Sequence, residues 1–283
     1  MEKIDLKNLE GKNLKEIIEF AENLSSKNLE DKINAYKIFL LLIDQTPNIY
    51  NHPYPNIRGF LRGKIWNLEK FFNWNEKYYS QFGQDKFIKE TFFRNKKKGF
   101  FLEIGAYDGI AGSNCFYFEK FLHWEGIAIE PSLTQFKKLK KNRKCNCLNN
   151  AISTNNQKID FNDVIEGLTM MSGPDNASYK KTLDVINSDA RSKIQKYKVE
   201  AVTFDKIVPK KKLIDYLSID IEGGELDVLK TIDFNSYDIK VISVENNDPK
   251  NINLNAIMKE KNFKYFDNFG VDEIYYNYKY FKF

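Results

Sequence analysis

The feature that most limits the fold of this chain is a regular alternation of short apolar runs with amphipathic stretches. It begins near residue 78 and continues to the end, as in FFLEIG before SNCFYFEKFLHW and GIAIEP before SLTQFKKLKKNRK. Strands that alternate with helices of this length form a mostly parallel sheet covered on both faces. We therefore predict an α/β fold, which residues 263–281 close with two further strands around Gly270 that add an antiparallel pairing.

A different pattern precedes this region. Residues 14–24 and 29–42 place apolar side chains along one face of a helix, and a third periodic segment runs through residues 65–72. We therefore divide the chain into a helical extension at residues 1–77 and a main domain at residues 78–283. The apolar stripes of the extension need a partner, so we expect it to pack on the main domain or to form a homo-oligomer.

The distribution of charge argues against a nucleic-acid partner. The chain has 44 Lys and Arg against 39 Asp and Glu, with a formal net charge of +5. Nucleic-acid binders concentrate basic residues on one face, whereas lysine is spread here through the whole chain beside nearly as many acids. The three cysteines, at positions 115, 145 and 147, are expected to be free thiols, because their number and spacing suit neither a disulfide framework nor a zinc site.

The N-terminus lacks the apolar core of a signal peptide. The longest apolar runs, such as IFLLLI at residues 38–43, are too short to span a bilayer. We therefore expect a cytoplasmic protein without a membrane span.

The first strand of the main domain ends in a glycine turn, FFLEIGAYDG at residues 100–109. Open parallel sheets bind ligands where their strands end. A dinucleotide site requires the motif G-x-G-x-x-G, and a P-loop ends in G-K-[ST]. This turn instead has the pattern E-x-G-x-x-x-G, and the bulky side chain of Tyr107 occupies its middle. Glu103 and Asp108 would repel a diphosphate and tolerate a cationic ligand.

A carboxylate, Glu130, follows at the end of the next strand. An acid at this position can accept hydrogen bonds from both hydroxyls of a ribose. The two turns together predict a ligand with a ribose and an adenine but no diphosphate. S-adenosylmethionine, whose sulfonium and amino groups are positive, meets these demands. A tight turn without a ligand is the alternative.

The sequence resembles the FkbM-type family of S-adenosylmethionine-dependent methyltransferases. The segments that carry the resemblance occur in the family's order: SQFGQD at 80–85, FFLEIGAYDG at 100–109, GIAIEP at 126–131, NNAIS at 149–153, DYLSIDIEGGELDVLK at 215–230 and KVISVENN at 240–247. The resemblance covers about residues 78–283 and leaves the extension unexplained. It implies a Rossmann-like class I methyltransferase fold, with a seven-stranded, mostly parallel sheet whose last strand is antiparallel.

The resemblance also implies where the cofactor lies. The glycine turn would contact the methionine end, Glu130 would hold the ribose, and NNAIS would lie near the adenine. The two glutamines of SQFGQD would cover the methionine end, unless that segment only starts a helix. The expected cofactor-binding residues are Gln81, Gln84, Glu103, Gly105, Ala106, Asp108, Glu130, Asn150, Ala151 and Ile152.

Acids and amides also end two later strands of the predicted sheet. Methyl transfer to an alcohol needs alignment and a group that takes the hydroxyl proton, or a metal that stabilises the alkoxide. We expect Asp220, Glu222 and Glu245 to be catalytic. Asp220, Glu245 and Asn246 offer oxygen ligands for Mg²⁺ or Mn²⁺, and this set looks like that of the metal-dependent catechol O-methyltransferases, with Glu245 replacing an Asp.

Two other interpretations of these acids stay open. Asp220 or Glu222 could act as a base without a metal, or Glu222 with Gly223 and Gly224 could only shape a helix N-terminus. Residues 164–196 look irregular, which suits a mobile lid or an acceptor loop, or an insertion without substrate contact.

The leading hypothesis is an enzyme that transfers a methyl group from S-adenosylmethionine to an oxygen. The resemblance implies an acceptor hydroxyl on a sugar or a natural product, and we expect a sugar or nucleotide-linked sugar used in surface polysaccharide biosynthesis. The alternatives are O-methylation of a non-sugar small molecule, a nicotinamide-dependent oxidoreductase, and a non-catalytic nucleoside-binding module. The missing G-x-G-x-x-G argues against the oxidoreductase.

Overall fold

The computed structural model describes residues 11–50, 52 and 56–283, so residues 1–10, 51 and 53–55 of the predicted extension lie outside the described residues. The helices are α1 (Leu14–Ser25), α2 (Leu29–Gln45), α3 (Ile57–Phe71), α4 (Gln84–Phe92), α5 (Phe116–Leu122), α6 (Leu133–Asn142), α7 (Lys180–Ser188), α8 (Phe204–Ile207), α9 (Glu225–Thr231), α10 (Leu254–Glu260) and the 3₁₀ helix η2 (Thr169–Met171). The strands are β1 (Phe100–Ile104), β2 (Glu125–Ile129), β3 (Asn146–Leu148), β4 (Ala151–Ile152), β5 (Gln157–Glu166), β6 (Gly173–Pro174), β7 (Lys193–Val202), β8 (Leu213–Ile219), β9 (Asp238–Glu245), β10 (Phe263–Phe269) and β11 (Asp272–Asn277).

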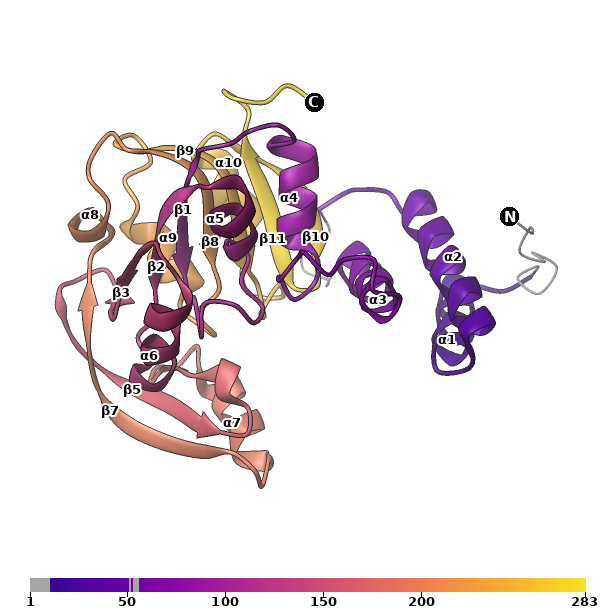
Figure 1. Ribbon diagram of the computed structural model, residues 1–283, viewed down its shortest axis with the longest axis horizontal. Helices are drawn as coiled ribbons and strands as arrows, with labels where there is room; N and C mark the ends of the chain where they lie inside the picture. Colours follow the sequence, from indigo (N-terminus) through magenta and orange to yellow (C-terminus); the bar gives the residue numbers. More distant parts are fainter. Residues whose placement is uncertain (1–10, 51, 53–55) are drawn as a thin grey trace.

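The main body is an α/β fold around a mixed seven-stranded sheet, which confirms the predicted fold class (Figure 1). The strand order is β10-β11-β9-β8-β1-β2-β3. Strands β3, β2, β1, β8 and β9 pair in parallel, whereas β11 runs antiparallel to β9 and to β10. The chain leaves β1 toward β2 on one side and returns to β8 on the other. Such a reversal of strand order opens a crevice at the carboxyl ends of the strands, where open α/β sheets bind ligands.

Both faces of this sheet are buried, which explains why its strands are apolar without clear alternation. Leu102 and Ile104 of β1 belong to a cluster that includes side chains of α9 and α10. Phe101 points to the other face and joins side chains of α4 and α5. Burial of each such side chain stabilises the fold by roughly 1.5–3 kcal/mol. The two layers hold β1 and β8 in place, and their carboxyl ends form the wall of the site described below.

A second sheet, with the strand order β4-β7-β5-β6, lies beside the first. Strands β5 and β7 run antiparallel and pair from Gln157↔Ala201 to Glu166↔Lys193. The prediction that residues 164–196 are irregular is therefore wrong, because β5, η2, β6, α7 and β7 occupy most of that range. The strands lack a strong apolar signal because exposed, oppositely charged side chains pair across them, as Lys198 does with Asp160 at 2.9 Å.

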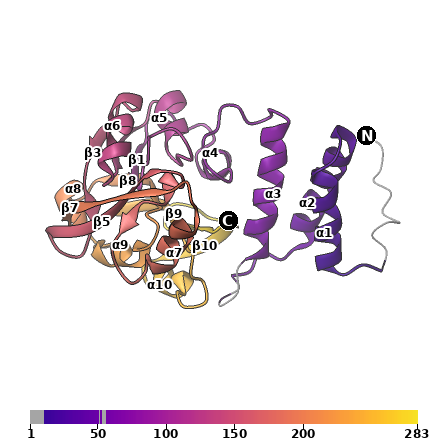
Figure 2. The ribbon, with the colours of Figure 1, turned by 90° about the horizontal axis from the view of Figure 1, so that it is seen from below.

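The N-terminal helices form a small core of their own, in which Ala21, Phe39 and Leu61 are fully buried. Helix α3 stands between the α1–α2 pair and the large sheet (Figure 2). It is fixed there by Asp267 of β10, whose buried carboxylate accepts hydrogen bonds from the guanidinium groups of Arg58 and Arg62. The described part of the extension therefore packs on the main body through α3.

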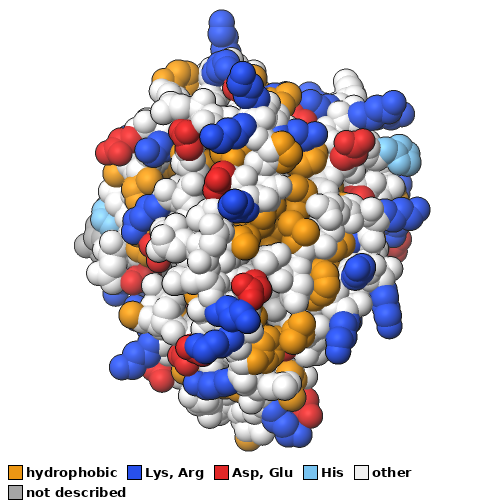
Figure 3. All heavy atoms as spheres, turned by 90° about the vertical axis from the view of Figure 1, so that its left-hand side faces the viewer, with side chains coloured by type: hydrophobic (Ala, Val, Ile, Leu, Met, Phe, Trp, Pro, Cys, Tyr) orange, Lys and Arg blue, Asp and Glu red, His pale blue; other side chains and the backbone are white. Residues whose placement is uncertain are grey.

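On the face shown in Figure 3, Lys and Arg side chains are scattered among acidic ones and do not gather into one patch. In the part of the chain that the structure describes, no helix has both the length and the apolar character that crossing a bilayer requires.

Candidate active site

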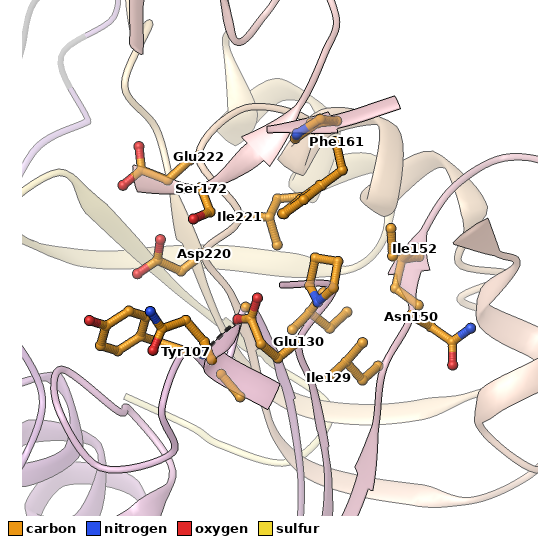
Figure 4. Close-up of a pocket in the computed structure, with 18 of the residues that line it drawn as sticks. Tyr107, Ile129, Glu130, Asn150, Ile152, Phe161, Ser172, Asp220, Ile221 and Glu222 are labelled. Atoms are coloured by element: carbon orange, nitrogen blue, oxygen red, sulfur yellow. Dashed lines mark hydrogen bonds between the residues drawn. The ribbon is translucent and has the colours of Figure 1, made fainter. Parts of the chain in front are cut away.

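A cavity of about 500 Å³ opens at the carboxyl ends of β1, β2, β8 and β9, and β5 and the segment around η2 close it from the opposite side. Its volume is typical of a small-molecule site. Asp220 and Glu222 lie at one end, Asn150 and Ile152 at the other, and Glu130 between them (Figure 4). The residues expected from the sequence that line it are Gln81, Gly105, Ala106, Glu130, Asn150, Ala151, Ile152, Asp220, Glu222 and Glu245.

The glycine turn after β1 is held by backbone contacts that only glycine permits. Gly105 has a φ of +88°, and a Cβ on it would lie 1.6 Å from the carbonyl oxygen of Asp220. The N–H groups of Gly105 and Ala106 both donate to the carbonyl oxygen of Ile129, at 3.0 and 2.9 Å. This close approach brings the ends of β1, β2 and β8 together at one wall of the cavity.

The carboxylate of Glu130 is oriented by two backbone donors. The N–H of Tyr107 donates to Oε2 and the N–H of Ser132 to Oε1, each at 2.8 Å. Because an ionised carboxylate accepts about four hydrogen bonds, about two acceptor positions are left on the cavity side. Burial raises the pKa of Glu130 to about 8. A ligand that donates hydroxyl groups to this side chain would favour its ionised form.

Two acids of the glycine turn do not line the cavity, which corrects the expectation that they contact the cofactor. The carboxylate of Glu103 is buried against Arg143 at 2.7 Å and also accepts from the hydroxyl of Ser113. Asp108 accepts the N–H groups of Ile110 and Ala111 at 2.9 and 2.8 Å. Both carboxylates therefore make hydrogen bonds within the fold and lie outside the lining of this cavity.

Two amide side chains also lie elsewhere than expected. Gln84 is buried, its Nε2 donates to Asp272 at 2.8 Å, and its Oε1 accepts the N–H of Phe82. Its amide is therefore occupied within the fold, while Gln81 alone of this pair lines the cavity. Asn246 donates to Glu273 at 2.7 Å and faces a different cavity, so the predicted metal set is corrected by removing it.

Three acids cluster at one end of the cavity. Asp220, Glu222 and Glu245 each place one carboxylate oxygen within 4.8 Å of the others. Oε2 of Glu245 is buried and has no hydrogen-bond partner among the described residues. Burial, followed by the charges of neighbouring acids, raises the pKa of Asp220 and of Glu245 well above the ordinary range.

Glu222 occupies a strained position in this cluster. Its φ is +60°, in the left-handed region that a side chain seldom adopts. The loop is fixed by Glu225, whose carboxylate accepts the N–H groups of Ile221, Gly223 and Gly224. Burial and the charge of Glu225 raise the pKa of Glu222 to about 7. A carboxyl group with such a pKa can both accept and release a proton near neutral pH.

The far wall contains residues that the sequence did not indicate. Phe161 of β5 lies across the cavity from Glu130 (Figure 4). The hydroxyl of Tyr107 lies 2.7 Å from that of Thr169, which ties the glycine turn to the segment around η2. Gln135 also lines the cavity, and its Nε2 has no hydrogen-bond partner among the described residues. The one available signal was an isolated aromatic residue, Phe161, within a polar strand.

Comparison with known protein families identifies this architecture. The model of the methyltransferase FkbM domain matches residues 103–265, more than half of the chain. The chain belongs to the FkbM methyltransferase family. The matched range contains the glycine turn, Glu130 and the acid cluster, whereas α1–α3 and Gln81 precede it.

Two solved structures are similar to the chain. One is methyltransferase FkbM from Methylobacillus flagellatus KT, with a TM-score of 0.41 and 9% sequence identity over 87% of this chain and 60% of that one. The other is the N-terminal domain of human METTL16, with a TM-score of 0.35 and 11% identity over 98% of each chain. The chain thus spans about 60% of the length of the Methylobacillus protein. No curated protein matches it.

Proposed function

We propose that this FkbM-family methyltransferase uses S-adenosylmethionine to methylate a hydroxyl oxygen. One observation carries the choice of cofactor: the described residues that line the cavity include seven carboxylates and no Lys, Arg or His. A diphosphate would find no cation in such a lining, whereas a sulfonium and an ammonium group would favour the ionised forms of these acids and be attracted to them. The lining thus favours S-adenosylmethionine over a nicotinamide dinucleotide.

The cofactor would lie along the cavity in one direction. Glu130 would accept the two ribose hydroxyls through its unused acceptor positions. The adenine would lie between Ile152 and Phe161, toward the end that also carries Asn150. The methionine part would extend past Gly105 toward Asp220, where the carboxylates complement its positive groups. Gln81 lines this part of the wall and offers an amide to the methionine carboxylate.

The acid cluster would then take up the hydroxyl proton of the acceptor. Methyl transfer is an in-line displacement, so catalysis rests first on holding the oxygen, the methyl carbon and the sulfur in line. The oxygen becomes a stronger nucleophile as it loses its proton to a base. We assign this role to Glu222, whose pKa is raised to about 7, with Asp220 and Glu245 placed to share the proton.

The alternative role of the same cluster is to hold a divalent cation with its carboxylates ionised. Three carboxylates with oxygens within 4.8 Å, one of them with a buried unpartnered Oε2, form the oxygen donor set that Mg²⁺ and Mn²⁺ prefer. Such an ion would stabilise the negative charge that develops on the acceptor oxygen. We propose Asp220, Glu222 and Glu245 as its ligands, in place of the set that included Asn246.

The remaining parts of the proposal rest on the family resemblance for the acceptor, and on the sequence pattern for the cytoplasmic location and the division of the chain. The acceptor would be a sugar used in surface polysaccharide biosynthesis in the cytoplasm. Residues 78–283 would be the methyltransferase domain and residues 1–77 a helical extension that packs on it or joins a second copy.

Calorimetric titration of the full chain with S-adenosylmethionine and, separately, with NAD⁺ tests the choice of cofactor. We expect saturable binding of S-adenosylmethionine only. Binding of NAD⁺ without binding of S-adenosylmethionine would overturn the proposal. Titration with MgCl₂ and MnCl₂ of the wild type and of Glu245→Gln tests the cation, and equal binding by both proteins would remove Glu245 from its ligands.

A further inference from the structure

A second cavity of about 440 Å³ lies at the same edge of the large sheet, beyond β9. Its walls come from α3, from the segment before α4, from the loop between β9 and α10, and from the turn between β10 and β11. The helical extension and the main body thus form this cavity together. None of the sequence motifs indicated it, because its walls come from segments far apart in the chain.

The two cavities share no lining residue, but residues adjacent in the chain line one and the other at two points. Gln81 lines the first cavity and Phe82 the second, and likewise Glu245 lines the first and Asn246 the second. Because Glu245 belongs to the acid cluster, Asn246 brings the wall of the second cavity next to the end of the first where the methyl group of the cofactor is expected. This is the place from which an acceptor oxygen would have to approach.

The lining of the second cavity suits an uncharged ring with hydroxyl groups. Tyr50, Phe60 and Phe82 offer aromatic rings, against which the C–H face of a saccharide ring can pack. Asn67 and Asn247 also line it, and both residues are exposed, so their amides are accessible to a ligand. Amide groups of this kind donate to and accept from hydroxyl groups.

The charged groups of this lining are already engaged. Lys64 pairs with Glu22, and His52 contacts the carbonyl oxygen of Pro249 at 2.8 Å. Glu273 accepts hydrogen bonds from Asn246 and from the hydroxyl of Tyr275. A phosphate would therefore find no unengaged cation among the described residues of the wall, and a neutral ligand fits better.

Gly63 in the wall of the second cavity could be replaced by a larger residue without disturbing the fold. Gly63 lies inside α3, and a Cβ on it would come no closer than 3.5 Å, to Cδ1 of Phe82. Alanine would thus fit, and it would stabilise the helix by about 1 kcal/mol relative to glycine. The missing side chain widens the cavity at a cost in helix stability.

We propose that the second cavity binds the methyl acceptor, and that this acceptor is a neutral saccharide unit. The inference rests on the proposed methyl transfer and narrows its substrate class. The saccharide ring packs on the aromatic wall, and one hydroxyl reaches past Glu245 to the methyl group. A nucleotide-linked sugar fits less well, because its diphosphate would meet no free cation in the described lining of either cavity.

Saturation-transfer NMR on the full chain, with a mixture of methyl glycosides of neutral hexoses and 6-deoxyhexoses, tests this site. We expect transfer to the ring C–H groups of at least one glycoside. Gly63→Leu should fill the cavity and weaken that binding on the order of tenfold or more, which corresponds to about 1.4 kcal/mol. Gly63→Ala serves as the conservative control, and its binding should stay within a few-fold of wild type.

Phe60→Ala is a second variant, because Phe60 is 40% exposed and its removal should not prevent folding. It too should weaken glycoside binding. Both variants should bind S-adenosylmethionine as the wild type does, whereas Glu130→Gln should weaken the cofactor and leave the glycoside unaffected.

The outcomes separate this inference from the proposed function. If the wild type binds S-adenosylmethionine but no neutral glycoside, or if Gly63→Leu and Phe60→Ala bind glycosides normally, the assignment of this cavity is wrong. Tighter binding of a uridine diphosphate hexose than of any neutral glycoside would contradict the substrate class. If the wild type does not bind S-adenosylmethionine, the proposed function itself is wrong.

Discussion

At Glu130, two backbone N–H groups hold a carboxylate whose pKa burial raises to about 8. Its other acceptor positions face the cavity, so a bound ribose would complete its hydrogen bonds. Glu130→Ala should weaken binding of S-adenosylmethionine by about 1–3 kcal/mol, as expected when a hydrogen-bonded acceptor is lost. Calorimetric titration measures this change.

Glu125→Ala is the matched control for that substitution, since Glu125 is exposed and begins strand β2, which ends just before Glu130. It should leave the affinity unchanged. An equal loss in both variants would show that the effect comes from the net charge of the protein and not from a ribose contact.

Proton uptake and release provide a second prediction for the acids of the cavity. Glu130, with a pKa raised to about 8, and Glu222, with a pKa raised to about 7, hold protons near neutral pH in the free protein. A cationic ligand that donates hydroxyls favours their ionised forms. Binding of S-adenosylmethionine should therefore release protons at pH 7. Titrations in buffers of different ionisation enthalpy measure the number released, and Glu130→Gln should reduce it.

The raised pKa values of Glu130 and Glu222 also predict how the stability of the free protein changes with pH. Their folded pKa values lie above the unfolded ones, so their contribution to the free energy of unfolding is fully present below about pH 4.5 and is lost as the pH rises to about 8. Between pH 5 and pH 8 the free protein should therefore lose stability in urea. Glu222→Gln should flatten this dependence, and an unchanged slope would show that Glu222 does not titrate in that range.

At the scale of single elements, the turn after β1 is the most constrained. Gly105→Ala would place a methyl group against the carbonyl oxygen of Asp220, in addition to the left-handed φ. The left-handed backbone alone costs roughly 1–2 kcal/mol, so the loss in free energy of unfolding should exceed this value, and cofactor binding should be lost.

Gly11→Ala separates the two causes, because Gly11 has a φ of +76° and no atom within 4 Å of a Cβ. It should show at most the backbone penalty in urea denaturation. If Gly105→Ala were no more destabilising than Gly11→Ala, the close contact between β1 and β8 would be refuted.

At the scale of the whole molecule, the position of α3 depends on Asp267. Its buried carboxylate accepts from Arg58 and Arg62, which are mostly buried themselves. Asp267→Ala would leave two buried cations without their partner, and loss of one side of such a pair costs about 3–5 kcal/mol. We expect a matching fall in the free energy of unfolding, and faster proteolysis between α2 and α3.

The pair of Lys64 and Glu22 is the control, because both side chains are about one third exposed. Glu22→Gln should change stability by less than about 1 kcal/mol. Since α3 also forms a wall of the second cavity, Asp267→Ala should weaken glycoside binding more than binding of S-adenosylmethionine. Equal loss of both would indicate general unfolding.

The α/β class followed from local patterns, because a buried strand and the turn that ends it are neighbours in sequence. Gly105 and Glu130 were identifiable for this reason. Seven of the ten residues expected to bind the cofactor line the cavity, some of them expected from such patterns and some from the family resemblance. The strands β5 and β7 were only partly recognised, since their exposed faces carry charged residues, which pair across the strands with residues far apart in the chain.

By itself the sequence determined the fold class, the family resemblance and the strand ends at which the site lies, because each depends on short segments with a fixed order. Only the tertiary structure decided which polar side chains face the cavity. Glu103 forms an ion pair with Arg143, and Gln84 donates a hydrogen bond to Asp272. Buried polar groups bond to the partners that packing brings near them. The second cavity likewise exists only where α3 meets the sheet.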